Sequence, residues 1–308
     1  MIAPETISDW LRRAGTLVWV NVQDPGPGEL EMLRKEFGFH HLALEDVTKQ
    51  RQRPKVDEYP NYYFVVLYAL LEGAAGGAVE TIELDLFVGR NYLVTLHREP
   101  IPALQEAGRR WEATDPALRT EVGFLLHAVA DAVMDAYFPL VEQIEERLEH
   151  AELTLFSGAG VLDPEEFLGI KRSLLTLRKA VYPVREVFNV FLRREHMQFH
   201  PDTYAYFQDV YDHVLRLLDS IDLERDMATG ALEAQLSVIS NRLNATMQRL
   251  TVIAVCVAVV GALFGAWGMN FTHVPLDNWG IAGFWTLIGS ALLLVTAVLG
   301  VTHRRGLW

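Results

Sequence analysis

Two stretches near the C-terminus decide the fold: LTVIAVCVAVVGALFGAWGMNFT at residues 250–272 and NWGIAGFWTLIGSALLLVTAVLGVT at residues 278–302. Neither contains an Asp, Glu, Lys or Arg residue, and a helix of about 20 apolar residues is enough to cross the core of a bilayer. A helix of a water-soluble protein rarely stays uncharged on every face over such a length. The sequence therefore predicts two transmembrane helices, at residues 250–270 and 279–302, joined by an outer loop at residues 271–278.

Basic side chains flank the two predicted spans. Arg242 and Arg249 precede the first, and Arg304 and Arg305 follow the second, within a basic tail at residues 303–308. Positive charge near the ends of a span stays on the cytoplasmic side. We therefore expect a multi-pass protein of the inner (plasma) membrane, in contact with the lipid bilayer, with both termini in the cytoplasm.

The remainder of the chain is acidic. Of the 27 basic and 40 acidic side chains, only Arg304, Arg305 and Asp277 lie beyond residue 249, so residues 1–249 carry 25 basic and 39 acidic groups. Such a charge repels nucleic acid and suits cations, although solubility alone explains it equally well. The single cysteine, Cys256, excludes an intrachain disulfide and a cysteine-based metal cluster. We find no phosphate-binding loop, nucleophile elbow or carboxylate dyad, and therefore expect neither an enzyme nor a nucleotide-binding protein.

The part of the chain before the spans divides into three segments. Residues 1–120 predict an α/β domain, a sheet with flanking helices, with strands expected at Thr16–Val22, Tyr62–Leu71, Glu80–Val88 and Asn91–Leu96. Residues 121–200 predict long antiparallel helices, Val122–Phe156 and Pro164–Glu195, because apolar residues recur there at spacings of three and four. We expect Pro183 to kink the second of these helices or to end it early. Residues 201–249 predict a stalk helix.

The stalk helix and the first span are expected to be continuous. No proline occurs between Pro201 and Pro275, so the sequence predicts one helix over Thr203–Trp267. The predicted fold class is therefore an α+β cytoplasmic domain joined by a very long stalk helix to two C-terminal transmembrane helices.

One face of this long helix carries a stripe of residues that changes character along its length. Its members are Asn244, Met247, Leu250, Ala254, Ala258, Gly261 and Gly265. Its apolar side chains are large at the cytoplasmic end and small deeper in the predicted span. This order fits a hydrophobic constriction that opens into a wider pore, formed by symmetric copies of the helix around an axis. Close helix packing is the alternative, because Gly261 and Gly265 form a GxxxG pair.

A Gly-Met-Asn tripeptide, Gly268–Asn270, follows the first predicted span. It is preceded in order by the blocks RPKV (residues 53–56), YPVREV (182–187) and YFQDVYDH (206–213), and by Ser240 and Asn241 before Asn244. With these blocks the chain resembles the CorA family of magnesium transporters over nearly its whole length. The resemblance implies a homopentamer with a funnel-shaped cytoplasmic domain, a pore lined by the first span, and the second span facing lipid.

The resemblance also implies that Gly268, Met269 and Asn270 form the selectivity filter. Mg²⁺ gives up its waters reluctantly, and a ring of Asn270 amides with Gly268 carbonyls offers acceptors to the hydrated ion without a charge that would trap it. A helix C-cap is the alternative role for Asn270. Because Ala258 stands where the family usually has a bulky apolar pore residue, we expect Met247 and Leu250 to form the hydrophobic gate.

Asp209 matches the family's intracellular sensing carboxylate, and Glu72 is the nearest candidate for the partner acid on the neighbouring subunit. Further acids follow on the same helix: Asp212, Asp219, Asp222, Asp226 and Glu233. A row of acids on adjoining subunits repels itself unless cations bridge it, and a solvated acidic face is the alternative. Histidines such as His127 lack a metal-ligand spacing, so we expect them at the surface or in the core.

The predicted outer loop departs from the family in carrying His273 and Asp277. An imidazole near a carboxylate suits Zn²⁺, Co²⁺ or Ni²⁺ better than Mg²⁺, although an exposed histidine without a ligand role is the alternative. The expected function is a channel for hydrated divalent cations, chiefly Mg²⁺ and also Co²⁺, driven by the membrane potential and closed by intracellular Mg²⁺ bound between subunits. The alternatives are a Zn²⁺, Co²⁺ or Ni²⁺ transporter of the same architecture and a membrane-tethered acidic scaffold.

Overall fold

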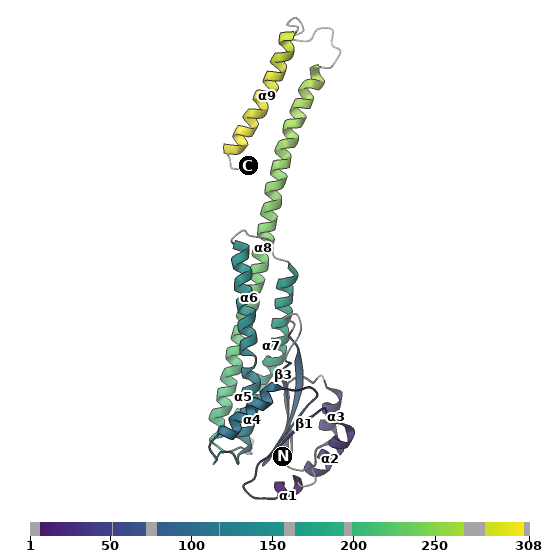
Figure 1. Cartoon of the computed structure of the whole chain (residues 1–308), viewed down its shortest axis with the longest axis vertical. Coiled ribbons are helices and arrows are strands. Elements are labelled where there is room, and N and C mark those ends of the chain that lie inside the picture. The colour runs from purple at the N-terminus through teal and green to yellow at the C-terminus, as the bar shows by residue number, and fades with distance from the viewer. Residues whose placement is uncertain are drawn as a thin grey trace. The chain divides into compact units, whose positions relative to one another are not determined.

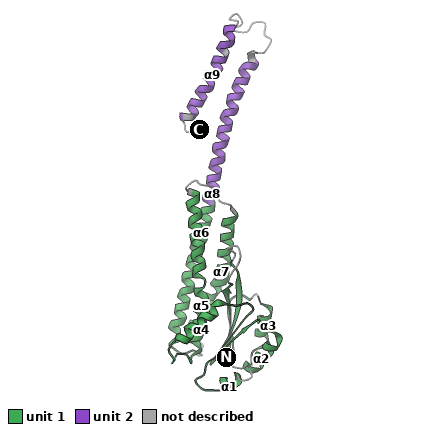
Figure 2. Ribbon diagram, in the orientation of Figure 1, with its two compact units in different colours: residues 1–232 green, residues 233–308 purple. Residues whose placement is uncertain are grey.

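The computed structural model describes residues 7–50, 52–71, 79–116, 118–156, 164–193, 199–267 and 281–304. The chain divides into two compact units, Met1–Leu232 and Glu233–Trp308 (Figure 2). The boundary between them lies within the helix Thr203–Trp267. The strands are β1 (Val18–Gln23), β2 (Lys55–Tyr59), β3 (Tyr62–Leu70), β4 (Thr81–Gly89) and β5 (Tyr92–His97). The helices are α1 (Ile7–Leu11), α2 (Pro27–Phe37), α3 (His41–Lys49), α4 (Pro102–Ala113), α5 (Val122–Asp135), α6 (Phe138–Phe156), α7 (Pro164–Leu192), α8 (Thr203–Trp267) and α9 (Ile281–Arg304).

The strands form one mixed sheet in the order β1-β5-β4-β3-β2. Figure 1 labels two of these strands, β1 and β3. β1 pairs with β5 in parallel, and the other neighbours are antiparallel. The four predicted strands are confirmed, whereas β2 was not predicted. It pairs with β3 through a two-residue turn, Pro60 and Asn61, with Tyr59 opposite Tyr62, and residues of these types between two strand-like runs are typical of a hairpin.

Alternate residues of each strand contribute to opposite faces of the sheet, because successive side chains of a strand point to opposite sides. Tyr62, Phe64 and Val66 of β3 pack with Phe87 of β4 against α2 and α3. Tyr63, Val65 and Leu67 face the opposite way and pack against a helical layer that includes α5, α6, α7 and α8. The sheet is thus buried on both sides.

The first part of α8 is a core helix of unit 1. Phe207, Val210, Val214, Leu217 and Ile221 are all fully buried, at spacings of three and four residues. This spacing is typical of helices that pack side by side along a shallow left-handed crossing. The predicted single helix over Thr203–Trp267 is confirmed with the same bounds.

One detail of the predicted long helices was wrong, and one alternative for a second is excluded. The stretch Val122–Phe156 is interrupted between Asp135 and Phe138, where the side chain of Tyr137 turns into the core and its hydroxyl donates to the Tyr68 carbonyl oxygen at 2.9 Å. Pro183 was predicted to kink α7 or to end it early, and the early end is excluded because α7 continues to Leu192. Val181, Val184 and Phe188 are buried around that proline, so tertiary packing supports the helix through it.

Within the described part of the chain, three helical stretches are long and apolar enough to cross a membrane: Val122–Leu155, Thr203–Gly265 and Ile281–Thr302. In the most apolar part of the first, 67% of the residues are buried inside the protein, against 0% and 6% for the other two. The apolar side chains of Val122–Leu155 are therefore explained by the core of unit 1. The other two stretches contain most of the predicted spans, residues 250–265 and 281–302, and their most apolar parts have almost no protein cover within the chain.

Candidate functional site

Several predicted site residues lie outside the described residues. They are the filter residues Gly268, Met269 and Asn270, the loop residues His273 and Asp277, and the acid Glu72. Their roles stay predictions. The predicted pore stripe and the residues around Asp209 can be examined.

The pore stripe lies entirely on α8, in unit 2. Its residues, Asn244, Met247, Leu250, Ala254, Ala258, Gly261 and Gly265, are all exposed in the single chain. Met247 and Leu250 expose 58% and 60% of their surface, which is unusual for large apolar side chains on a helix. A continuous apolar surface of this kind requires lipid or further protein to cover it.

Asp209 lies in a group of five polar residues that α5 and α8 bring together, the His–Asp cluster. α5 contributes His127, Asp131 and Asp135, and α8 contributes Asp209 and His213. Residues four apart in a helix lie on the same face, so each set points the same way. The helices lie side by side because Val129 and Val133 of α5 share a core with Val210 and Val214 of α8.

Distances within the His–Asp cluster are short enough for shared ligation. Asp209 lies 3.9 Å from the Nε2 atom of His127 and 3.8 Å from the Nε2 atom of His213. His213 Nδ1 lies 3.0 Å from Asp131 Oδ1 and 3.8 Å from Asp135 Oδ1. Two sets have ligand atoms that all lie within 4.8 Å of one another: His127 with Asp131 and Asp209, and Asp131 with Asp135 and His213.

Arg110 of α4 occupies one side of the cluster. Its Nη1 atom donates to Asp131 Oδ2 at 2.6 Å and to Asp135 Oδ2 at 2.8 Å. The other oxygen of Asp131 is buried without a hydrogen-bond partner among the described residues, as are His127 Nε2 and His213 Nδ1. His213 Nδ1 and Asp131 Oδ1 are close but are not oriented as a hydrogen bond. Buried polar atoms without partners are uncommon and call for an explanation.

The cluster offers the donor set of a divalent-cation site. Burial lowers the pKa of His127, although Asp131 and Asp209 oppose this effect, and the neutral imidazole is the form that binds metal. Carboxylate oxygens suit Mg²⁺, and imidazole nitrogens extend the range to Co²⁺, Ni²⁺ and Zn²⁺. The Asp209 side chain is 56% exposed, so a hydrated ion has access to the cluster from solvent.

The other predicted acids on α8 do not join the cluster. Asp212 and Asp219 are exposed, and Asp212 accepts a hydrogen bond from Gln208 at 3.0 Å. Asp222 lies 2.9 Å from Arg178 and 3.0 Å from Arg225, and Asp226 also accepts from Arg225. Guanidinium groups of the same chain therefore already neutralise part of this acidic row.

Sequence reasoning missed His127, Asp131, Asp135 and His213 as partners of Asp209. A signal was present in the spacing, since His127, Asp131 and Asp135 follow each other at four-residue steps and Asp209 precedes His213 by four. Each spacing alone is common on solvated helices, and only the packing of α5 against α8 brings the two sets together.

The chain is similar to known proteins over most of its length. The family model described as "CorA-like Mg2+ transporter protein" matches residues 14–304. The chain is 34% identical to the Bacillus subtilis protein YfjQ, over 93% of this chain and 88% of that protein. It is 29% identical to the cobalt/magnesium transport protein CorA of Thermotoga maritima, over 87% and 77% of the two chains. The solved structure of the CorA magnesium transporter from Methanocaldococcus jannaschii matches with a TM-score of 0.81 at 24% identity, covering 94% of this chain and 91% of that one.

Proposed function

Because the chain belongs to the CorA-like Mg²⁺ transporter family, a family of divalent metal ion transporters, we propose that it is a homopentameric channel for hydrated Mg²⁺, with Co²⁺ as a second substrate. Its two spans are residues 250–270 and 279–302, in the inner (plasma) membrane with both termini in the cytoplasm. The observation that carries the proposal is the exposed, uncharged part of α8 beyond Arg249. Five copies of this surface around an axis form a pore whose wall holds no charge.

The conduction path follows from the residues along the pore stripe. A hydrated cation is recognised at Gly268 to Asn270 through its waters, because amide and carbonyl oxygens accept hydrogen bonds without a full charge. Below this filter, Ala254, Ala258, Gly261 and Gly265 keep the wall smooth. The membrane potential drives the ion inward, at about 2.3 kcal/mol per charge per 100 mV.

Regulation is assigned to the His–Asp cluster. Intracellular Mg²⁺ bound near Asp209, with Glu72 of the neighbouring subunit completing the ligands, offsets the repulsion between carboxylates and holds the subunits together. The bound form favours the closed pore, and loss of the ion releases the subunits. The unpartnered buried atoms of His127, Asp131 and His213 support this assignment.

A second candidate is a Zn²⁺, Co²⁺ or Ni²⁺ transporter of the same architecture. The observation that favours it is the pair of imidazoles, His127 and His213, placed beside Asp209. Nitrogen ligands shift the preference of a site from Mg²⁺ towards later transition metals.

Ion flux into liposomes that contain the purified full-length protein tests both candidates. Mg²⁺, Co²⁺, Ni²⁺ and Zn²⁺ are compared side by side under an imposed membrane potential. The Mg²⁺ channel predicts potential-driven Mg²⁺ uptake with Co²⁺ as the other permeant ion. Uptake of Zn²⁺ or Ni²⁺ without Mg²⁺ would establish the second candidate, and no uptake of any of the four would contradict both.

The predicted gate gives a specific result in the same assay. Leu250→Gly removes a large apolar side chain from the constriction, so water enters the pore and the Mg²⁺ leak at high internal Mg²⁺ rises several-fold. Met247→Asp should also raise the Mg²⁺ leak, because the carboxylates attract water into the part of the constriction that lies nearer the cytoplasm.

Val255→Gly is the matched control for the gate. Val255 is also exposed on α8, and glycine weakens the helix there as well, although somewhat less than at Leu250. Five residues from Leu250 place Val255 on the opposite face of the helix. If Leu250→Gly and Val255→Gly raise the leak equally, the effect comes from a weakened helix and the gate lies elsewhere.

A further inference from the structure

One side of α7 exposes large apolar side chains at regular intervals. Leu168, Leu175 and Tyr182 follow each other at seven-residue steps and expose 44%, 46% and 42% of their surface. Residues seven apart lie on the same face of a helix, two turns from each other. The core of unit 1 holds α7 by other residues, such as Leu174 and Leu177. The three exposed residues, the α7 stripe, therefore form a second apolar face, and such a spacing is typical of a helix that packs against another helix.

The α7 stripe is surrounded by positive charge. Residues 168–185 carry five cations and no acid, a net charge of +5. The cations are Lys171, Arg172, Arg178, Lys179 and Arg185. The guanidinium groups of Arg178 and Arg185 lie 5.2 and 5.1 Å from the centre of the Tyr182 ring. A surface that fits this stripe therefore combines apolar side chains with acids.

The exposed side of α8 within unit 1 has this complementary character. Leu223 exposes 59% of its surface and is the most exposed large apolar side chain on this part of the helix. The exposed charged residues there are four acids and one cation: Asp209, Asp212, Arg216, Asp219 and Asp226. Asp212, Asp219 and Asp226 lie at seven-residue steps, which places them in a row beside Leu223. Both helices thus carry an apolar face with flanking charge, of opposite sign.

The register between such helices can be derived from contacts within the chain. Arg178 of α7 lies 2.9 Å from Asp222 of α8, and the ring centroids of Phe191 and Phe207 are 5.5 Å apart. The two helices are therefore antiparallel, and Leu175 lies within one helical turn of the level of Leu223. In the proposed pentamer, rotation about an axis along α8 leaves every level unchanged. Leu175 of one subunit therefore comes level with Leu223 of the neighbouring subunit.

Ring symmetry requires two different surfaces on each subunit that fit one another, because every subunit has a neighbour on either side. The α7 stripe and the exposed face of α8 satisfy this requirement. The face of α8 also extends from Leu223 through Arg216 to Asp209, at two seven-residue steps. It therefore includes the position where Glu72 of the neighbouring subunit is proposed to complete the ligands.

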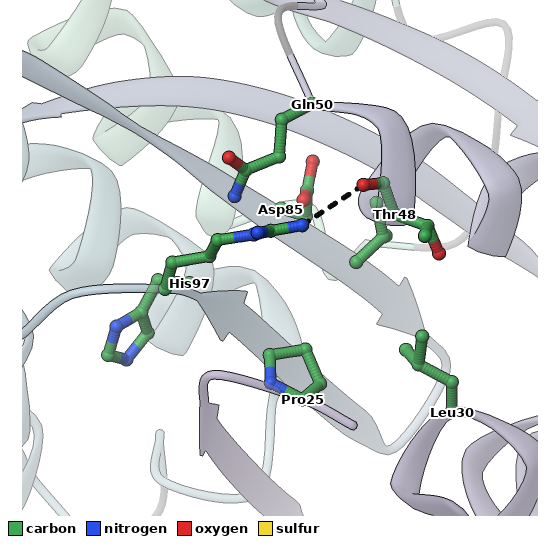
Figure 3. Close-up of a pocket in the computed structure, with 8 residues that line it drawn as sticks. Pro25, Leu30, Thr48, Gln50, Asp85 and His97 are labelled. Carbon is green, nitrogen blue, oxygen red and sulfur yellow. Dashed lines mark hydrogen bonds between the residues drawn. The ribbon is translucent and has the colours of Figure 1, made fainter. Parts of the chain in front are cut away.

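The other face of the sheet offers no comparable surface. Among the described residues of α1, α2 and α3, Leu42 is the only exposed large hydrophobic side chain. Two acids of β4 that lie beneath α3, Glu83 and Asp85, are 4% and 2% exposed. Asp85 and Thr48 line a cavity of about 310 Å³ at the end of α3 (Figure 3). A cavity of this size holds small groups, whereas a helix with its side chains is about 10 Å across.

We propose that the α7 stripe of each subunit packs antiparallel against the exposed face of α8 in the next subunit, with Leu175 against Leu223 and the α7 cations beside the α8 acids. Single surface ion pairs contribute little to stability, so the charges select the partner surface and its direction, and the apolar side chains provide the contact. The proposal rests on the proposed homopentamer and names the surfaces through which its subunits join.

Cross-linking between differently tagged subunits tests the contact. Two full-length copies are expressed together, one with Leu175→Cys and the other with Leu223→Cys, both in a Cys256→Ser background. Oligomers in detergent are purified through both tags and treated with a short bis-maleimide linker. We expect a covalent dimer that carries both tags. Because the two cysteines are on different chains, a contact within one chain cannot produce it.

Leu153→Cys, in place of Leu175→Cys, is the matched control. Leu153 is 64% exposed on α6, so its cysteine is at least as accessible, but the proposal places no neighbouring α8 beside it. An intact oligomer in which both pairs give equal yields of dimer would overturn the proposed contact while leaving the pentamer in place. A wild type that is monomeric by light scattering would instead contradict the homopentamer and, with it, this contact.

Charge exchange tests the complementarity. Lys171→Glu with Lys179→Glu reverses one cation on each side of the α7 stripe and should raise the protein concentration at which half of the oligomer dissociates by about tenfold or more. Asp219→Lys with Asp226→Lys should have the same effect from α8. All four changes together should restore most of the affinity between subunits. If the fourfold variant assembles no better than either double variant, the two surfaces do not meet.

Lys35→Glu with Lys49→Glu is the control for charge exchange. These lysines are 68% and 65% exposed on α2 and α3, so the variant changes the net charge of the chain equally, outside the proposed contact. Its assembly should match that of the wild type. If it weakens assembly as much as the α7 double variant does, net charge alone explains the effect and the proposal is contradicted.

Discussion

Asn270→Ala should reduce Mg²⁺ flux in liposomes to the level of protein-free vesicles while leaving the oligomer intact. The amide would be lost from every subunit at once, so a ring of uncharged acceptors for the hydrated ion would disappear. Asn270→Asp should also fail to conduct, for the opposite reason, because a ring of carboxylates would bind the cation too tightly to release it. Flux is measured by a Mg²⁺-sensitive dye inside the vesicles, and assembly by size-exclusion chromatography.

Asn278→Ala is the control for this experiment, since it removes an amide at the other end of the predicted outer loop. We expect it to conduct as the wild type does. Normal flux through an intact Asn270→Ala oligomer would remove Asn270 from the filter and leave the helix C-cap as its role.

Asp209→Ala should raise the Mg²⁺ concentration that protects the protein from protease by at least about tenfold. A charge-assisted ligand contributes about 1.5–3 kcal/mol, and 1.4 kcal/mol corresponds to a factor of ten. The measurement is the rate of limited proteolysis of the purified full-length protein over a Mg²⁺ titration. Asp209→Lys supplies a positive charge in place of the ion and should be protected even without Mg²⁺.

Asp202→Ala provides a matched control for Asp209→Ala. Asp202 is an exposed carboxylate 3.5 Å from His200, so this variant also breaks an Asp–His pair, outside the cluster. Its Mg²⁺ titration should superimpose on that of the wild type. If the Asp209→Ala curve does so as well, Asp209 has no sensing role and the acidic face of α8 is ordinary solvation.

The helical parts of the fold could be predicted because their signals are local. The absence of proline between Pro201 and Pro275, together with the uncharged span that begins at Leu250, was enough to predict α8 as one helix. The break before Phe138 could not be predicted in this way, since it depends on Tyr137 reaching the carbonyl of Tyr68, far away in the sequence. For a related reason Pro183 does not end α7 early, because the core around α7 outweighs the local penalty of a proline.

The site residues divide along the same line. Asp209 was predicted as a site residue because a motif marks it, whereas His127 and Asp131 become its neighbours only when α5 packs against α8. Glu83 and Asp85 alternate with Leu84 and Leu86, a pattern typical of a strand with one face exposed to solvent. They are buried because α3 covers that face of the sheet, and the spacing of residues in β4 does not predict the position of α3.

The helix α8 contains both the cluster residue Asp209 and the predicted gate residue Leu250, about 60 Å apart along its axis at 1.5 Å per residue. Between them the backbone hydrogen bonds run without interruption, and Gly230 is the only glycine. Such a segment resists twisting because every turn is bonded to the next. In the proposed pentamer, a rotation of α8 at Asp209 would therefore also turn Leu250, and the five Leu250 side chains would move together.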